Sequence, residues 1–190
     1  IIHLKKYLSS TDYKNLNVLI KNKNKKKGLL SFDLNPNQKI ILISLKKNQK
    51  SNETEKSGAK LTDFLKSEGV EVIHIVSDTI SLNLKPDAIY EFLHGMRLKS
   101  YSFDRYKSKK ESNTLKVYIA SLKKFDKKIY DKFKAIELGV NYTKDLVSEP
   151  GNILHPDEYA RRLTQLKKIG LKVSVYNEKQ LKNMGCNALV

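Results

Sequence analysis

Residues 39–76 read KIILISLKKNQKSNETEKSGAKLTDFLKSEGVEVIHIV, and this stretch decides the fold class. Lys39 to Leu45 is a nearly continuous aliphatic run, which is typical of a strand buried on both faces. From about Glu53 to Ser67 the apolar residues follow a helical spacing, and Gly69 is well placed to stop that helix. Val70 to Val76 predicts a second strand. A strand, a helix and a strand at this spacing form a βαβ unit, which predicts an α/β fold with a mixed, largely parallel sheet flanked by helices.

Further elements extend this pattern in both directions. Towards the N-terminus, Leu16 to Ile20 predicts a short strand. Lys21 to Lys27 (KNKNKKK) predicts an exposed turn, with a phosphate or lipid contact as the alternative. Towards the C-terminus we expect a helix over Asp87 to Lys99 opened by Pro86, a strand over Thr114 to Ala120, and a long helix from Asp126 to about Ser148 whose apolar stripe holds Ile129, Phe133, Ile136, Val140 and Val147.

A second group of elements follows Pro150, which ends the long helix. A helix begins at Pro156, with Tyr159, Leu163 and Leu166 facing inward, and stops at Gly170. The remaining expectations are a strand over Leu171 to Tyr176, a short helix from a capping box of Asn177 and Gln180 to Gly185, and a strand that begins at Ala188 to Val190. We therefore expect an N-terminal α/β domain at 1–125, a connector helix at 126–149, and the truncated start of a second α/β domain at 150–190.

The charge of the chain is strongly basic, at +17 with an isoelectric point near 9.7. Such a surface is compatible with nucleic acid. The basic residues are nearly all lysine, however, and arginine, which suits bidentate recognition, stands only at Arg97, Arg105, Arg161 and Arg162. We favour a solvated surface over a nucleic-acid face, which stays the alternative. A nucleotide site ranks last, because no glycine pair has the spacing of a phosphate loop.

The remaining composition limits other classes of function. No apolar run approaches the roughly 18 residues that a membrane span needs, and no signal peptide is present, so we expect a cytoplasmic protein. His3, His74, His94 and His155 have no metal-like spacing. We interpret His74 as a packed core histidine, His94 as helix surface and His155 as a helix cap. Cys186, the only cysteine, is interpreted as a buried structural thiol.

Two charged clusters have open interpretations. Asp104, Arg105 and Lys107 form either a surface ion-pair turn or a subunit contact. Arg161 and Arg162 either solvate a helix face or bind a domain that follows in a longer protein. We assign no catalytic, metal-binding or cofactor-binding residue to this chain.

The segment KDLVSEPGNILHPDEYARR, from Lys144 to Arg162, strongly resembles the leucyl aminopeptidase (cytosol aminopeptidase) family at the passage from its N-terminal to its catalytic domain. A second patch, Gly95 with Leu98 to Lys107 (LKSYSFDRYK), resembles a helix end of the same family. Ser148 departs from the usual asparagine, and His155 replaces a capping threonine, so that cap is expected to be weaker. The matching positions of the first segment are Asp145, Leu146, Glu149, Pro150, Asn152, Pro156, Tyr159 and Ala160.

The resemblance implies a macro-domain-like N-terminal domain of a hydrolase that removes N-terminal residues from peptides. It also implies a homo-hexamer and two divalent metals, manganese or zinc, held in a catalytic domain downstream of these residues. The chain itself is therefore expected to bind no metal and to be inactive. Contact with DNA, also known in the family, is the alternative function.

Overall fold

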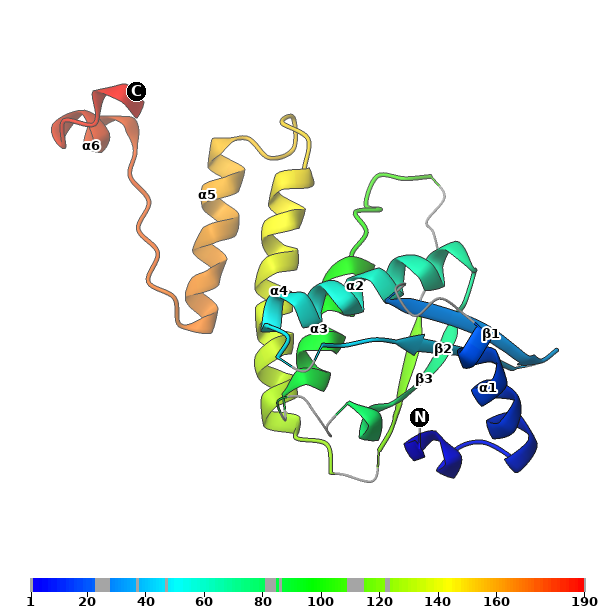
Figure 1. Cartoon of the computed structure of the whole chain (residues 1–190). Coiled ribbons are helices and arrows are strands. Elements are labelled where there is room, and N and C mark those ends of the chain that lie inside the picture. The colour runs from blue at the N-terminus through cyan, green and yellow to red at the C-terminus, as the bar shows by residue number, and fades with distance from the viewer. Residues whose placement is uncertain are drawn as a thin grey trace. The chain divides into compact units, whose positions relative to one another are not determined.

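The computed structural model describes residues 2–22, 28–36, 38–46, 48–80, 85, 87–108, 115–121 and 124–189. The predictions made for residues 23–27, Pro86 and Val190 lie outside these ranges. The chain divides into two compact units, Ile1–Asn141 and Tyr142–Val190, and each is described by itself (Figure 1). The division falls inside one long helix. The expected domains at 1–125, 126–149 and 150–190 stay a prediction.

The first unit alternates helices with short strands, which confirms the mixed α/β class. Helix α2 ends as expected, with Gly69 at a φ of 65°. The elements in chain order are η1 (Ile2–Lys6), α1 (Ser10–Asn22), β1 (Leu29–Asn35), β2 (Gln38–Ile43), α2 (Ser51–Ser67), β3 (Val72–Val76), η2 (Ser77–Thr79), α3 (Ala88–Ser100), β4 (Lys116–Ala120) and α4 (Lys127–Ser148), which continues into the second unit.

The described strands form two small sheets. Strands β3 and β4 are parallel, with His74 opposite Tyr118. Strand β2 does not pair with β3, as the expected βαβ unit would require, but forms an antiparallel hairpin with β1. A hairpin needs only a short turn between its strands, whereas a parallel pair needs a crossover connection. The backbone hydrogen bonds of β2 are therefore made with β1, its neighbour in the sequence. Strand β1 was missed although Ser31, Asp33 and Asn35 alternate with apolar residues, which is the period of a half-buried strand.

Alternate residues of β2 point to opposite faces of the hairpin, and each face packs on a different apolar core. Ile41 and Ile43 pack on the core that α2 and α3 build with β3 and β4. Ile40 and Leu42 pack on the core that α1 builds. This explains the continuous apolar run of β2, which has a helix on each face. The buried members of the first core are Leu61, Leu65, Phe92, Leu93 and Met96, and those of the second are Leu16, Ile20 and Phe32.

The expected strand at Leu16 to Ile20 is wrong, because these residues belong to α1. Ser9 begins the helix: its Oγ accepts a hydrogen bond from Asp12 N at 3.0 Å. Leu16 and Ile20, four residues apart, are buried, while Val18 between them is 58% exposed. Residues i and i+4 share one face of a helix, whereas in a strand Val18, at i+2, would lie on the same face and would be buried with them.

Helix α4 begins as expected, since Asp126 Oδ1 accepts hydrogen bonds from the backbone of Lys128 and Ile129 at 2.9 and 3.2 Å. Part of its expected apolar stripe is wrong. Val147 is 80% exposed and Ile136 is also exposed, whereas Leu146 is buried. No helix in the described part of the chain is long and apolar enough to cross a membrane.

The second unit contains the end of α4, then α5 (Pro156–Thr164), η3 (Gln165–Ile169), α6 (Glu178–Asn183) and η4 (Asn187–Leu189). Gly170 ends η3 at a φ of 91°, as expected. Asn177 and Gln180 form the expected capping box. The expected strand over Leu171 to Tyr176 is wrong: this segment has no regular secondary structure. The expected strand at 188–190 is also wrong at its described residues, which lie in η4.

Candidate functional site

The turn between α4 and α5 is built by its two prolines. Pro150 ends α4 and its carbonyl accepts hydrogen bonds from Ile153 N and Leu154 N, both at 2.9 Å. Pro156 then begins α5, where its missing N–H costs nothing. His155 precedes it in an extended conformation, but its side chain makes no capping hydrogen bond. The prediction that this cap is weak is confirmed, and the prediction that the histidine replaces it is wrong.

Four charged side chains connect the end of α4 to α5. The carboxylate of Glu149 is fully buried, and Arg162 Nη1 lies 3.0 Å from its Oε1. Arg162 also donates from Nε to Glu158 Oε1 at 2.8 Å. Arg161 binds the same Glu158 with two hydrogen bonds, at 2.6 and 2.7 Å. Arg162 is therefore not a solvating residue, as one interpretation had it, but the partner of a buried charge.

The arginines control the ionisation of Glu158. Hydrogen bonds from Arg161 and, next in size, Arg162 lower the pKa of this carboxyl group from 4.5 to about 2. Opposite charges at hydrogen-bond distance favour the ionised form of a carboxyl group. Glu158 and its two arginines therefore stay charged at neutral pH, and Arg162 links α5 to Glu149 at the end of α4.

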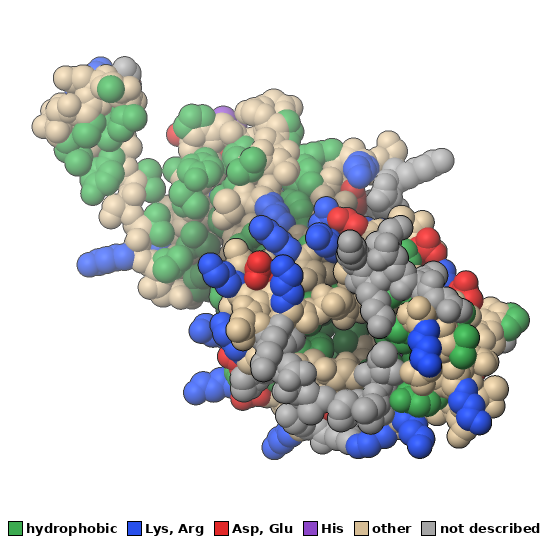
Figure 2. All heavy atoms as spheres, viewed as in Figure 1, with side chains coloured by type: hydrophobic (Ala, Val, Ile, Leu, Met, Phe, Trp, Pro, Cys, Tyr) green, Lys and Arg blue, Asp and Glu red, His purple; other side chains and the backbone are tan. Residues whose placement is uncertain are grey.

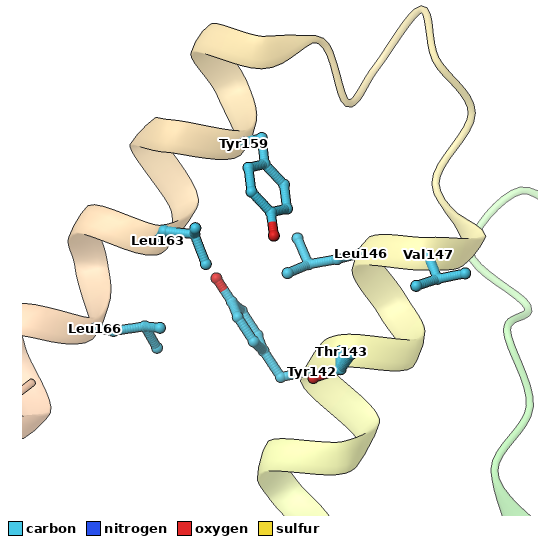
Figure 3. Close-up of a pocket in the computed structure, with 7 residues that line it drawn as sticks. All are labelled: Tyr142, Thr143, Leu146, Val147, Tyr159, Leu163 and Leu166. Atoms are coloured by element: carbon cyan, nitrogen blue, oxygen red, sulfur yellow. The ribbon is translucent and has the colours of Figure 1, made fainter. Parts of the chain in front are cut away.

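An apolar groove lies beside this cluster, between α4 and the α5–η3 segment (Figure 3). Its volume is about 270 Å³. Figure 3 shows the ring of Tyr142 rising from α4 towards Leu163, with Tyr159 above it on α5. The hydroxyl of Tyr142 is buried and has no hydrogen-bond partner within the described structure. The residues that line the groove are Tyr142, Thr143, Leu146, Val147, Tyr159, Leu163 and Leu166.

The sequence identified half of this groove. Tyr159, Leu163 and Leu166 were predicted to face inward, and all three line it. Tyr142 was missed, although it stands four residues before Leu146, on the same face of α4. Glu149 belonged to the matched segment, but nothing in the sequence alone predicted its burial.

Two histidines have the opposite burial from the one predicted. His94 is only 6% exposed, so the prediction of a helix-surface position is wrong. Its Nδ1 lies 3.0 Å from Glu55 Oε1, and its ring packs 5.1 Å from that of Phe133. His74 is exposed and stacks on Tyr118, with ring centroids 5.0 Å apart, so the predicted core position is wrong. The core takes its neighbours Ile73 and Ile75 instead, because successive strand residues face opposite sides.

The other candidate residues lie on or near the surface. Lys107 Nζ lies 2.7 Å from Asp104 Oδ1, which confirms the ion-pair turn, while Arg105 lies over the ring of Phe103. Cys186 is half-buried rather than buried. The side chain of His3 lies outside the described residues. Over the described ranges, no group of three or more His, Cys, Asp or Glu side chains is arranged to hold a metal ion.

The fold is that of the N-terminal region of leucine aminopeptidases. A mutant of tomato leucine aminopeptidase superposes on 90% of this chain with a TM-score of 0.70, at 18% identity, and the chain covers 37% of it. The bottromycin maturation enzyme BotP in complex with Mn superposes on 94% of the chain with a TM-score of 0.62, at 13% identity, and the chain again covers 37%. These likenesses establish the fold alone.

Sequence comparisons identify the family. Residues 20–110 match the cytosol aminopeptidase family, N-terminal domain. A probable cytosol aminopeptidase of Rhizobium johnstonii is 32% identical over 164 residues, which are 82% of this chain and 33% of the relative. One of Phytoplasma australiense is 37% identical over 119 residues, which are 61% of the chain and 24% of the relative. The chain belongs to the cytosol aminopeptidase family and carries its N-terminal domain. It spans at most a third of the length of these relatives.

Proposed function

We propose that this chain is the N-terminal, non-catalytic portion of an aminopeptidase that removes N-terminal residues from peptides. The observation that carries the proposal is the match to the family's N-terminal domain over residues 20–110. The relatives at 24–33% coverage bear the name aminopeptidase and extend well beyond the matched region. Cytoplasmic location and hexameric assembly belong to the same proposal.

The proposal assigns metal chemistry to the part of the relatives that this chain does not match. One structural neighbour was solved in complex with Mn, which supports a divalent metal in that part. The described residues of this chain do not fit such a site, because they hold no cluster of three or more metal-ligating side chains. No catalytic step is therefore assigned to them.

The test is hydrolysis of a leucine anilide by the purified 190-residue chain with added manganese. We expect no turnover above background, because the described residues hold no cluster of metal-ligating side chains that could activate the attacking water. A chimera in which the chain replaces the matched N-terminal portion of the Rhizobium johnstonii relative should hydrolyse the same substrate and lose activity on chelation. Turnover by the chain alone, or a folded chimera without activity, would contradict the proposal. The comparisons give no support to the nucleic-acid alternative.

A further inference from the structure

Basic charge is concentrated at the start of the sequence. Residues 1–28 hold eight lysines and one acidic residue, Asp12, which is a net charge of +7 out of +17 in about a seventh of the chain. Five of these lysines stand in residues 21–27 (KNKNKKK), directly after α1. A cluster of about four to eight basic residues on an amphipathic helix is typical of contact with anionic lipid. The described surface of α1 therefore decides whether this interpretation fits.

Helix α1 is amphipathic, and its outward face is basic. Leu16 and Ile20 are buried in the core of the first unit. Lys14, Val18 and Lys21 are exposed and lie on the opposite side of the helix, because they are spaced by four and three residues. An apolar side chain between two lysines suits a helix that lies on a bilayer, since the apolar group reaches inward while the lysine stems extend to the headgroups.

The short helix η1 extends this basic surface. Lys5 and Lys6 are exposed, while Leu4 and Leu8 on either side of them pack on the same core as α1. The lysines of η1 are therefore carried by a segment that is anchored to the first unit. Figure 2 shows lysine and arginine side chains over the region of α1, with hydrophobic side chains between them.

The charge of this surface is not compensated by its neighbours. Ion pairs among the described residues hold other lysines, such as Lys127, which lies 2.6 Å from Asp131 on α4. The acidic residue of α1, Asp12, accepts a hydrogen bond from Ser9 Oγ at 2.7 Å. Positive charge that faces outward without acidic partners attracts a surface of opposite charge.

We propose that the outward face of α1, together with the exposed lysines of η1, binds the surface of an anionic phospholipid bilayer. Val18 enters the headgroup region, and the lysines around it bind the lipid phosphates. Nucleic acid is a poorer occupant for two reasons. A phosphate backbone offers nothing apolar for Val18 to contact, and residues 1–28 contain no arginine, the residue that binds phosphate with two hydrogen bonds. The inference does not depend on the proposed peptidase function.

The first experiment uses an introduced fluorescent residue, because the chain contains no tryptophan. Val18→Trp places the reporter on the proposed face, and Leu138→Trp is the matched control, since Leu138 is 61% exposed on α4. With vesicles of equal parts phosphatidylglycerol and phosphatidylcholine at physiological salt, the emission of Val18→Trp should shift to the blue and that of Leu138→Trp should not. Vesicles of phosphatidylcholine alone should shift neither. Equal shifts in both variants, or no shift in either, would overturn the proposal.

The second experiment measures co-sedimentation of the chain with the same mixed vesicles. Replacing Lys14 and Lys21 together by glutamine should weaken binding at least tenfold, because each lysine near an anionic bilayer strengthens adsorption roughly fivefold. Replacing Lys128 and Lys132 by glutamine removes the same charge from exposed positions of α4. That control should leave binding nearly unchanged, because α4 lies apart from α1 (Figure 1) and charges beyond the screening length contribute little.

A third variant separates lipid from other anionic partners. Val18→Ser keeps the charge and removes the apolar group, so it should weaken binding to the mixed vesicles and leave binding to heparin unchanged. Val18 is 58% exposed, so the substitution disturbs no core. If Val18→Ser binds the vesicles as the unaltered chain does, the surface acts by charge alone and the proposal is wrong.

The remaining outcomes are equally decisive. Equal losses from the two double lysine variants would make adsorption an effect of the total charge and would overturn the proposal. Displacement of the chain from the vesicles by a smaller amount of duplex DNA, with the same dependence on Lys14 and Lys21, would make nucleic acid the occupant. None of these measurements involves peptide hydrolysis, so their failure would leave the proposed function standing.

Discussion

At the residue scale, a cluster of ion pairs at the end of α4 and in α5 is the main charged feature described above for the second unit. Glu158 accepts hydrogen bonds from both Arg161 and Arg162. Glu149 is fully buried and faces Arg162 at 3.0 Å. A buried ion pair contributes little to stability as a pair, but removal of one member leaves an uncompensated charge, which is strongly destabilising. Glu158 therefore binds both arginines, whereas Glu149 binds Arg162 of the two.

Acid should destabilise α5, because Glu158 binds Arg161 and Arg162 of the same helix. Folding lowers the pKa of Glu158 from 4.5 to about 2, so its contribution is complete above the unfolded pKa and is lost as the pH falls through the folded value. We expect the protection of the α5 amides, measured relative to their intrinsic exchange rates at each pH, to fall as the pH is lowered between these two pKa values. Glu158→Gln should show a smaller loss of protection over the same range. Identical pH profiles for the two proteins would contradict the assignment.

The two neighbouring arginines should differ when each is replaced. Arg162→Met removes the 3.0 Å ion pair from the buried carboxylate of Glu149, so we expect the melting midpoint of the second unit to fall by several degrees. Arg161→Met is the matched control. Arg161 is the more exposed of the two. Its partner among the described residues is Glu158, which keeps its other arginine. Circular dichroism melts of both variants make the comparison, and an equal loss would show that Glu149 does not need Arg162.

At the element scale, α2 and α3 of the first unit approach each other closely at two glycines. A Cβ added to Gly95 would lie 2.0 Å from the backbone oxygen of Glu55, and one added to Gly58 would lie 2.0 Å from that of Phe92. Both obstacles are backbone atoms within helices, which cannot move aside as a side chain can. These glycines thus set the distance between the helices that support β3 and β4.

Gly95→Ala should therefore destabilise the first unit by about 3 kcal/mol, the upper part of the range for overpacked cores. Gly139→Ala is the control within α4, where an added Cβ meets nothing within 4 Å. That substitution should stabilise by about 0.5–1 kcal/mol, because alanine is the better helix former. Urea denaturation measures both. A loss below about 1 kcal/mol for Gly95→Ala would show that the helices move apart without cost.

The sequence predicted the elements whose signals are local. The beginning of α4 follows from Asp126, its end from Pro150, and α6 from the box of Asn177 and Gln180, because caps and prolines act within a few residues. Strands were harder to predict from the sequence, because a strand forms only where a partner strand supplies its hydrogen bonds. Residues 171–176 have the pattern and no partner in the described chain, and β2 found its partner in β1.

Burial was predicted less well than secondary structure. His94 lies among Phe92, Leu93 and Met96, and the side of α3 that is buried is wider than a single stripe. Its partner Glu55 is distant in the sequence, so no local pattern predicts their pairing. The groove has one wall from α4 and one from the α5–η3 segment, and only the second was predicted, from its helical spacing. The burial of Tyr142 and of Glu149 depends on how α5 packs against α4, which no local pattern shows.

At the scale of the whole molecule, the excess of lysine sets the long-range behaviour. The 37 lysines and arginines outnumber the 20 acidic residues and leave a net charge of +17. Several described lysines bind acidic partners, such as Lys39 with Glu68 at 2.7 Å and Lys127 with Asp131 at 2.6 Å. The rest of the basic charge acts as a diffuse field. Such a field attracts any polyanion without reading its sequence.

Duplex DNA should accordingly bind this chain only weakly and without sequence preference. Counterion release makes such binding fall steeply with salt, so we expect it to be lost between about 50 and 200 mM salt. Heparin titrated in parallel is the control, and a purely electrostatic surface should retain it at least as well as the duplex. Fluorescence anisotropy at several salt concentrations measures both slopes. Duplex binding that persists near physiological salt, with heparin a poor competitor, would instead demonstrate a built nucleic-acid face. It would restore the alternative function that the lysine-rich composition first raised.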